Sequence, residues 1–162
     1  MRFRAYRPDD LAAVHAINQG EVPAVGDETV EGLGRIADQS VIALVAEDDG
    51  AVAGFCLVLA PGADYGSGNY RWFSERYDEF IYLDRVAISP SFQRRGLGRA
   101  MYAEVERLAA ECRPAATDFT LEVNVRPRND TSLAFHASLG FVEVGQRETS
   151  YGALVSLMAK PL

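Results

Sequence analysis

The chain has 162 residues, of which 48% are hydrophobic and 24% are charged, and its formal net charge is −7. These values are typical of a soluble globular protein, and we expect residues 1–162 to form one domain with a sizeable core. No apolar run approaches the roughly 20 residues that span a bilayer, so a membrane protein is excluded. The acidic balance disfavours nucleic acid as a partner, because phosphates require a basic surface.

Cysteine and histidine are scarce. Cys56 and Cys112 lie in a predicted strand and a predicted helix without metal-ligand spacing, which favours two buried free thiols. His15 and His136 are the only imidazoles, so we expect no bound metal. The first seven residues alternate polar and apolar side chains, unlike a signal peptide, and we expect a cytoplasmic protein.

The N-terminal part predicts one strand followed by two helices. Residues 2–7 alternate as a strand does, and Pro8 opens a helix with Asp residues in its first turn. The segment 18–26 contains a proline and two glycines and is expected to break this helix. Asp27 is expected to cap the second helix.

The rest of the chain mixes hairpins with helical crossovers. An aromatic-rich stretch at 65–80 includes a short helix at 69–77 and is expected to form either core or a lid over a site. The other predicted elements are strands 41–47 and 52–60 around an Asp-Asp-Gly turn, strand 79–89, helix 98–112, strand 119–125, helix 130–138 and a terminal hairpin, 141–147 with 154–160. This order implies an α/β protein with a mixed sheet covered by helices on both faces.

The segment Gln93-Arg94-Arg95-Gly96-Leu97-Gly98 joins a buried strand to a helix. The unpaired N–H groups and positive dipole end of a helix N-terminus bind phosphate, and glycines let the backbone approach it. Arg94, Arg95 and Arg99 add charge-assisted contacts. The segment lacks the Gly-Lys-Ser/Thr ending of a P-loop, and Met101 stands where the dinucleotide fingerprint has its third glycine. It therefore predicts an anion site of another kind.

This segment matches the (Q/R)-x-x-G-x-(G/A) signature of the GNAT superfamily of N-acetyltransferases. A second match follows at 129–141, where Asn-Asp-Thr-Ser-Leu-Ala-Phe-His-Ala-Ser-Leu-Gly-Phe resembles the later family motif N-x-x-(A/S)-x-x-x-Y-x-x-x-G-F. The resemblance extends from about Glu79 to Val144. The start of the chain, with Asn18 and the segment 22–26, resembles a bacterial subgroup of predicted acetyltransferases.

The resemblance implies a GNAT fold of the α/β (α+β) class, with a mixed, mostly antiparallel central sheet of about seven strands. The strands 79–89 and 119–125 would splay apart and hold acetyl-CoA, the expected cosubstrate. The expected cofactor-binding residues are Val86, Ala87, Ile88, Arg94, Arg95, Gly96, Leu97, Gly98, Arg99, Ala100, Asn129, Ser132 and Phe135.

The implied reaction is direct attack of a primary amine on the thioester, and the amine must first lose a proton because its free pKa lies well above 7. Strand alternation puts Tyr82, Asp84 and Val86 on one face. In the resemblance, Tyr82 stands where some relatives carry a glutamate base and Asp84 where others carry an acidic residue, which makes Asp84 the first candidate for the base and Tyr82 the second, with Glu79 in reserve. The alternative for Asp84 is a salt bridge with a nearby arginine.

The remaining proton-transfer groups lie on the two later elements. His136 lies four residues before Gly140, where many relatives carry a tyrosine acid; it either protonates the departing thiolate or packs as a neutral ring. Glu122 and Asn124 share a face and could orient a water that relays the proton.

The acceptor is expected beside the first two helices, with Asn18, Glu21 and Tyr82 as candidate contacts. It would be a primary amine of a small molecule or a protein. One alternative is a CoA-binding sensor or structural module without catalysis, and another is a nucleotide-binding domain that uses the same glycine turn. The terminal hairpin pairs across a dimer in several relatives, which leaves a homodimer open.

Overall fold

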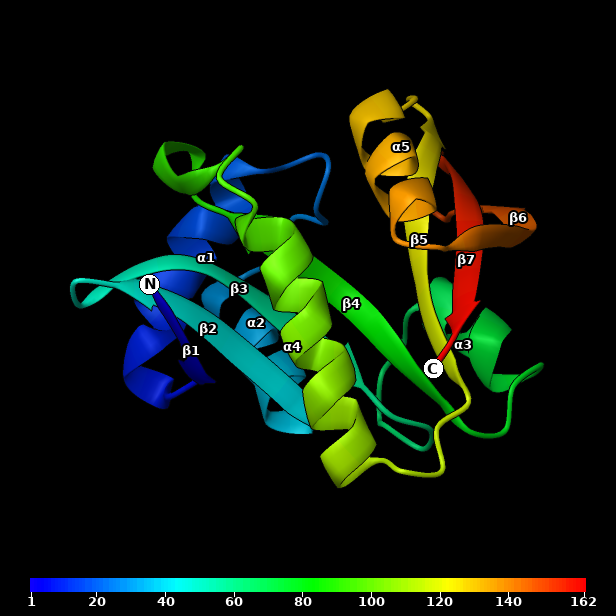
Figure 1. Cartoon of the computed structure of the whole chain (residues 1–162). Helices are drawn as coiled ribbons and strands as arrows, with labels where there is room; N and C mark the ends of the chain where they lie inside the picture. The colour runs from blue at the N-terminus through cyan, green and yellow to red at the C-terminus, as the bar shows by residue number, and fades with distance from the viewer. The chain divides into compact units, whose positions relative to one another are not determined.

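The computed structural model describes residues 1–162, and its strands form one mixed, mostly antiparallel sheet in the order β1-β2-β3-β4-β5-β7-β6 (Figure 1). This confirms the predicted fold class and strand number. The elements are β1 (Arg2–Ala5), the 3-10 helix η1 (Pro8–Asp10), α1 (Leu11–Gly20), α2 (Val30–Gln39), β2 (Ile42–Asp48), β3 (Ala51–Leu59), α3 (Gly68–Ser74), β4 (Phe80–Ile88), the 3-10 helix η2 (Pro90–Phe92), α4 (Leu97–Cys112), β5 (Asp118–Arg126), α5 (Asp130–Ser138), β6 (Val142–Glu148) and β7 (Leu154–Pro161). None of the helices is long and apolar enough to cross a bilayer.

The chain divides into two compact units. The first unit contains Met1–Leu59 and Leu83–Pro114, and the second contains Ala60–Tyr82 and Ala115–Leu162. Whether the whole chain behaves as one domain stays a prediction.

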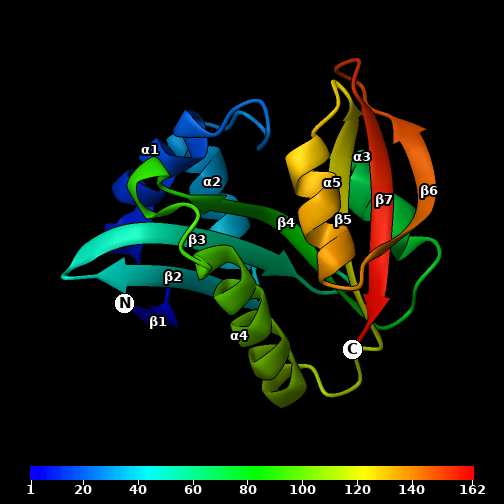
Figure 2. The ribbon, with the colours of Figure 1, turned by 45° about the horizontal axis from the view of Figure 1, so that its top comes forward.

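In the first unit, β1, β2 and β3 pair antiparallel, with Phe3 opposite Ala46 and Leu44 opposite Cys56. Helices α1 and α2 cover one face of these strands and α4 covers the other, as both ribbon views show (Figures 1 and 2). Each helix turns its apolar stripe to the sheet, which buries the core of this unit. Its fully buried side chains include Leu33, Val45, Phe55 and Met101.

One predicted boundary in this unit is confirmed and another is wrong. Helix α1 ends at Gly20, inside the segment 18–26 that was expected to break it, and the Asn18 side chain turns inward and bonds within the fold. The cap of α2 is Thr29, whose hydroxyl accepts the N–H of Gly32 at 3.0 Å, whereas the expected cap, Asp27, accepts a bond from Gln19.

The two thiols differ in exposure. Cys56 is buried in β3, and burial raises the pKa of its thiol to about 12. Cys112 is exposed, so its predicted burial is wrong. Burial along α4 follows steps of four residues from Leu97 to Ala109, and Cys112 lies three residues past the end of that stripe.

In the second unit, Phe80–Tyr82 of β4 pairs parallel with Asp118–Thr120 of β5, while β7 lies antiparallel between β5 and β6. Helix α5 lies on one face of these strands and α3 on the other (Figure 2). The Tyr70, Phe73 and Phe80 rings of the aromatic stretch are buried around Tyr82. For these three residues the lid interpretation is wrong, because their burial builds the core of the unit.

Candidate active site

The turn between β4 and α4 has a backbone that suits an anion. Gly96 is the N-cap of α4 with φ +78°, and Arg94 also has a positive φ, +61°. No side chain caps the helix, so its first N–H groups are left to other acceptors. A Cβ on Gly96 would meet no protein atom within 4 Å, which means that the backbone there faces open space. We call residues 93–99 the anion turn.

Three arginines surround this turn. Arg94, Arg95 and Arg99 are all exposed, and the Arg95 guanidinium lies 5.5 Å from the centroid of the Phe92 ring. Exposed guanidinium groups beside free helix N–H groups form a donor set that matches phosphate oxygens in charge and geometry. The residues present therefore fit the pyrophosphate of a coenzyme A derivative.

Gln93 ties the anion turn to its surroundings. Its side-chain amide donates to the carbonyl oxygen of Ile88 at 2.9 Å and to Oε1 of Glu21 at 2.8 Å. A Cβ at Gly54 of β3 would lie 2.9 Å from the Ala87 carbonyl oxygen, so glycine there permits the close approach of β3 to β4. The backbone of Val86–Ile88 is thereby fixed next to the turn.

Asp84 and Arg85 form an ion pair on β4. The Arg85 Nε donates to Oδ2 of Asp84 at 2.7 Å, and the two side chains are only 6% and 3% exposed. The Arg85 Nη1 also donates to Oδ1 of Asn18, which is fully buried, and to the Gly26 carbonyl oxygen. The predicted base is thus a buried partner of arginine, and its catalytic role stays a prediction.

Sequence reasoning did not single out Arg85. The signal for it is present, because alternation along β4 places it with Leu83 and Ala87 on the buried side of the strand. An arginine at a core position requires a buried partner, which marks it for attention.

Tyr82 and Glu122 form a second polar pair, in the second unit. The Tyr82 hydroxyl donates to Oε2 of Glu122 at 2.7 Å, and the tyrosine ring is fully buried against Tyr70 and Phe73. Glu122 is half-buried on the face of β5 that also carries Asn124. A carboxylate and a phenol at hydrogen-bond distance are able to relay a proton.

The predicted cofactor residues of α5 have local partners. Asn129 is the N-cap of the helix, and its Oδ1 accepts the N–H of Ser132 at 3.0 Å. The Ser132 carbonyl oxygen lies 2.7 Å from Nδ1 of His136, and because a carbonyl oxygen only accepts, Nδ1 is the donor in this bond. His136 is buried between Phe135 and Phe141, and burial lowers its pKa below 6.5. The burial of His136 and its lowered pKa favour a packing role, while its acid role and the contacts of these residues with a cofactor stay predictions.

Residues 11–141 match the Acetyltransferase (GNAT) family. The chain belongs to this family. Its similarity to the [ribosomal protein bS18]-alanine N-acetyltransferase of Salmonella typhimurium is 39% identity over 69 residues, which cover 43% of this chain and 44% of that protein. The match thus spans less than half of this curated relative.

Solved structures agree with the GNAT assignment across the whole chain. The ribosomal-protein-alanine N-acetyltransferase from Brucella melitensis is 25% identical, with a TM-score of 0.74 and coverage of 100% of both chains. Arabidopsis thaliana NAA60, solved in complex with acetyl-CoA, shares the fold with a TM-score of 0.77 at 17% identity, covering 99% of both chains. The acetyltransferase resemblance inferred from the two sequence motifs is confirmed.

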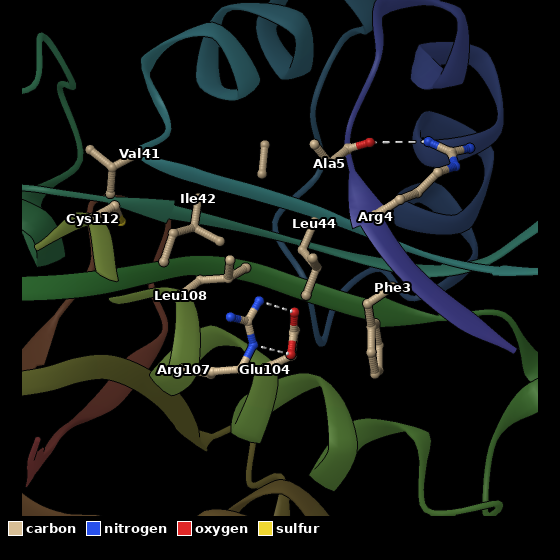
Figure 3. Close-up of a pocket in the computed structure, with 11 residues that line it drawn as sticks. Phe3, Arg4, Ala5, Val41, Ile42, Leu44, Glu104, Arg107, Leu108 and Cys112 are labelled. Atoms are coloured by element: carbon tan, nitrogen blue, oxygen red, sulfur yellow. Dashed lines mark hydrogen bonds and ion pairs between the residues drawn. The ribbon is translucent and has the colours of Figure 1, made fainter. Parts of the chain in front are cut away.

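A separate hollow of about 360 Å³ lies in the first unit of this GNAT chain, between β1, β2 and α4 (Figure 3). Its wall is mainly apolar, and the ion pair of Glu104 with Arg107 stands at its side. Its lining is Phe3, Arg4, Ala5, Val41, Ile42, Ala43, Leu44, Glu104, Arg107, Leu108 and Cys112. No predicted site residue is among them, so the hollow is distinct from the anion turn.

Proposed function

We propose that this GNAT chain transfers the acetyl group of acetyl-CoA to the α-amine at the N-terminus of a protein. The observation that carries the proposal is the anion turn, with Gly96 in a left-handed conformation at an uncapped helix start and arginines on both sides. The acceptor class is supported by the alanine N-acetyltransferases among its relatives.

The anion turn and the end of β4 would hold the cofactor. The N–H groups of residues 94–99 would bind the pyrophosphate, and Arg94, Arg95 and Arg99, which are exposed, would neutralise its charge. The Val86–Ile88 backbone, at the end of β4, would hydrogen-bond the pantetheine arm as it would an added strand. Asn129, Ser132 and Phe135 are proposed as secondary contacts, and bound acetyl-CoA supplies an activated thioester.

Tyr82 and Glu122 are the better-supported pair for moving the amine proton. Glu122 is half-buried and its carboxylate is bonded to a phenol, whereas the Asp84 carboxylate is paired with a buried guanidinium. We therefore place Glu122 first, with Tyr82 as its partner, and Asp84 second. Because His136 is buried, its pKa is lowered and its Nδ1 donates to the Ser132 carbonyl oxygen, we assign it to packing and retain the acid role only as an alternative.

The acceptor side is proposed to lie at the end of α1. Glu21 is half-exposed and its carboxylate attracts a cationic amine before deprotonation. Asn18 is fully buried, so we revise its proposed role from contacting the acceptor to holding the loop. Three further properties stay predictions from the sequence. They are a cytoplasmic location, the absence of nucleic acid and membrane partners, and a homodimer built on the terminal hairpin.

The test is release of the CoA thiol from acetyl-CoA in the presence of peptides that begin with alanine, with N-blocked peptides of the same sequence as control. We expect turnover only with the free α-amine, and a fall in kcat/KM of about 10²–10⁴-fold for Glu122→Gln. Acetyl-CoA binding without turnover for any amine would instead support a non-catalytic CoA-binding module. Equal turnover of the free and blocked peptides would refute the assigned acceptor.

A further inference from the structure

We propose that Arg85 is a positioning residue that holds the loop between α1 and α2, residues 21–29, against β4 and thereby sets the affinity for the acceptor. This inference rests on the proposed function, since it takes this loop as the acceptor side of the site.

A guanidinium buried beside a carboxylate adds little net stability. The Arg85 and Asp84 side chains are 6% and 3% exposed, with Nε and Oδ2 2.7 Å apart. Desolvation of such a pair offsets most of its Coulomb energy, and apolar residues of similar volume pack at least as well. The net stabilisation by this ion pair therefore does not account for an arginine at position 85. The other hydrogen bonds of the Arg85 side chain indicate what it does.

Those donors reach the loop. Nη1 of Arg85 donates to Oδ1 of Asn18 at 3.1 Å and to the Gly26 carbonyl oxygen at 3.3 Å. The Asn18 amide nitrogen donates to the same carbonyl oxygen at 3.1 Å. Gly26 is thus held from two sides, by α1 through Asn18 and by β4 through Arg85.

The loop is held by polar contacts and not by apolar packing. None of residues 21–29 is buried, so apolar packing contributes little to its order. Its other side-chain ties come from Gln19, whose amide donates to Asp27 at 2.8 Å, and from Gln93, which donates to Glu21. The His15 ring also contributes, since its Nε2 lies 2.8 Å from the Glu28 carbonyl oxygen. Polar contacts therefore determine the loop conformation, and the Arg85 bond to Gly26 is partly buried and is supported by the buried Arg85–Asn18 bond.

Arg85 is connected both to the strand that is proposed to bind the cofactor and to the loop that is proposed to bind the acceptor. It directly precedes the Val86–Ile88 backbone that is proposed to bind the cofactor, and Gln93 links the Ile88 carbonyl to Glu21. The loop is thereby attached to the cofactor strand at Gly26 and at Glu21. Loosening the Gly26 attachment leaves the cofactor contacts intact but forces the acceptor to order the loop when it binds, which weakens acceptor binding.

The test is Arg85→Lys, which keeps a cation beside Asp84 but loses the planar fork that reaches both Asn18 and the Gly26 carbonyl oxygen. Arg4→Lys is the matched control, because Arg4 is also largely buried and bonds Asp10 and Glu47, away from the loop. For Arg85→Lys we expect an acceptor KM at least about 10-fold higher, with kcat and the acetyl-CoA Kd within about twofold of wild type. For Arg4→Lys we expect an unchanged acceptor KM.

Hydrogen exchange gives a readout that needs no acceptor. Backbone amides of residues 21–29 should exchange faster in Arg85→Lys than in wild type or Arg4→Lys. An unchanged KM, an equal rise in KM for both variants, or unchanged exchange in the loop would overturn the role of Arg85. Failure of the wild-type protein to acetylate any N-terminal amine would instead refute the proposed function, while the exchange experiment would still decide whether Arg85 orders the loop.

Discussion

A negative charge placed at Gly96 tests whether the anion turn is the coenzyme site. Gly96 and Gly50 offer a matched pair, because their φ values are +78° and +81° and a Cβ at either would meet nothing within 4 Å. Gly50 lies in the β2–β3 turn, outside the anion turn. Gly96→Asp and Gly50→Asp therefore impose the same backbone strain and the same charge change, and only the first places that charge at the proposed site.

The size of the effect follows from this geometry. An L-residue in the left-handed region costs about 1–2 kcal/mol, which for a chain of this length lowers Tm by about 2–8 °C in both variants. Acetyl-CoA at about 100 times its Kd stabilises a binding protein by about 2.7 kcal/mol, which raises Tm by about 5–11 °C.

The assay is thermal unfolding with and without acetyl-CoA, with ATP as the comparison ligand. We expect wild type and Gly50→Asp to show the full shift with acetyl-CoA, and Gly96→Asp to lose most of it. If Gly96→Asp shifted as much as Gly50→Asp, the coenzyme would not bind at this turn. An equal shift with ATP would point to a nucleotide site.

Three further substitutions have outcomes set by the contacts of the second unit. Tyr82→Phe keeps the buried ring but removes the bond to Glu122, and should lower the free energy of unfolding by about 1.5–3 kcal/mol in denaturant titrations; an unchanged value would contradict the importance of the bond. His136 has a lowered pKa in the fold, so the free energy of unfolding of wild type should fall as pH drops below 6.5. The difference in unfolding free energy between wild type and His136→Gln should therefore shrink from pH 7.5 to pH 5.5, and a constant difference would contradict the neutral buried ring. Asn129→Ala should cost about 1 kcal/mol through the lost cap of α5, whereas Asn129→Asp should not, as measured by Tm; an equal loss in both would contradict the capping role.

Local sequence signals predicted the elements well where one signal dominated. The predicted bounds of α5, residues 130–138, agree with the structure, because Asn129 is a strong cap followed by a helical run. The break of α1 within segment 18–26 was also predicted correctly, whereas the cap of α2 was wrong, because Asp27 accepts a bond from Gln19 and Thr29 caps the helix instead. A contact between side chains eight residues apart decided that boundary, and a local pattern does not contain it.

In the candidate site, too, the features set by local sequence were predictable and those set by tertiary contacts were not. The anion turn was predictable, since its glycines and arginines are contiguous and Gly96 adopts the positive φ that its position requires. The pairing of Tyr82 with Glu122 joins residues 40 positions apart, and that of Arg85 with Asn18 joins residues 67 apart. Such pairs depend on strand register and helix placement, so alternation indicated which face each side chain occupies but not its partner.

The most direct measurement is the position of the acetyl group on a peptide that begins with alanine and also contains lysine, incubated with the protein and acetyl-CoA. Tandem mass spectrometry of the product distinguishes the α-amine from the lysine side chain. The proposed function predicts a single acetyl group on the terminal alanine, absent in Glu122→Gln reactions of the same duration. Acetylation confined to lysine, or no acetylation at all, would contradict it.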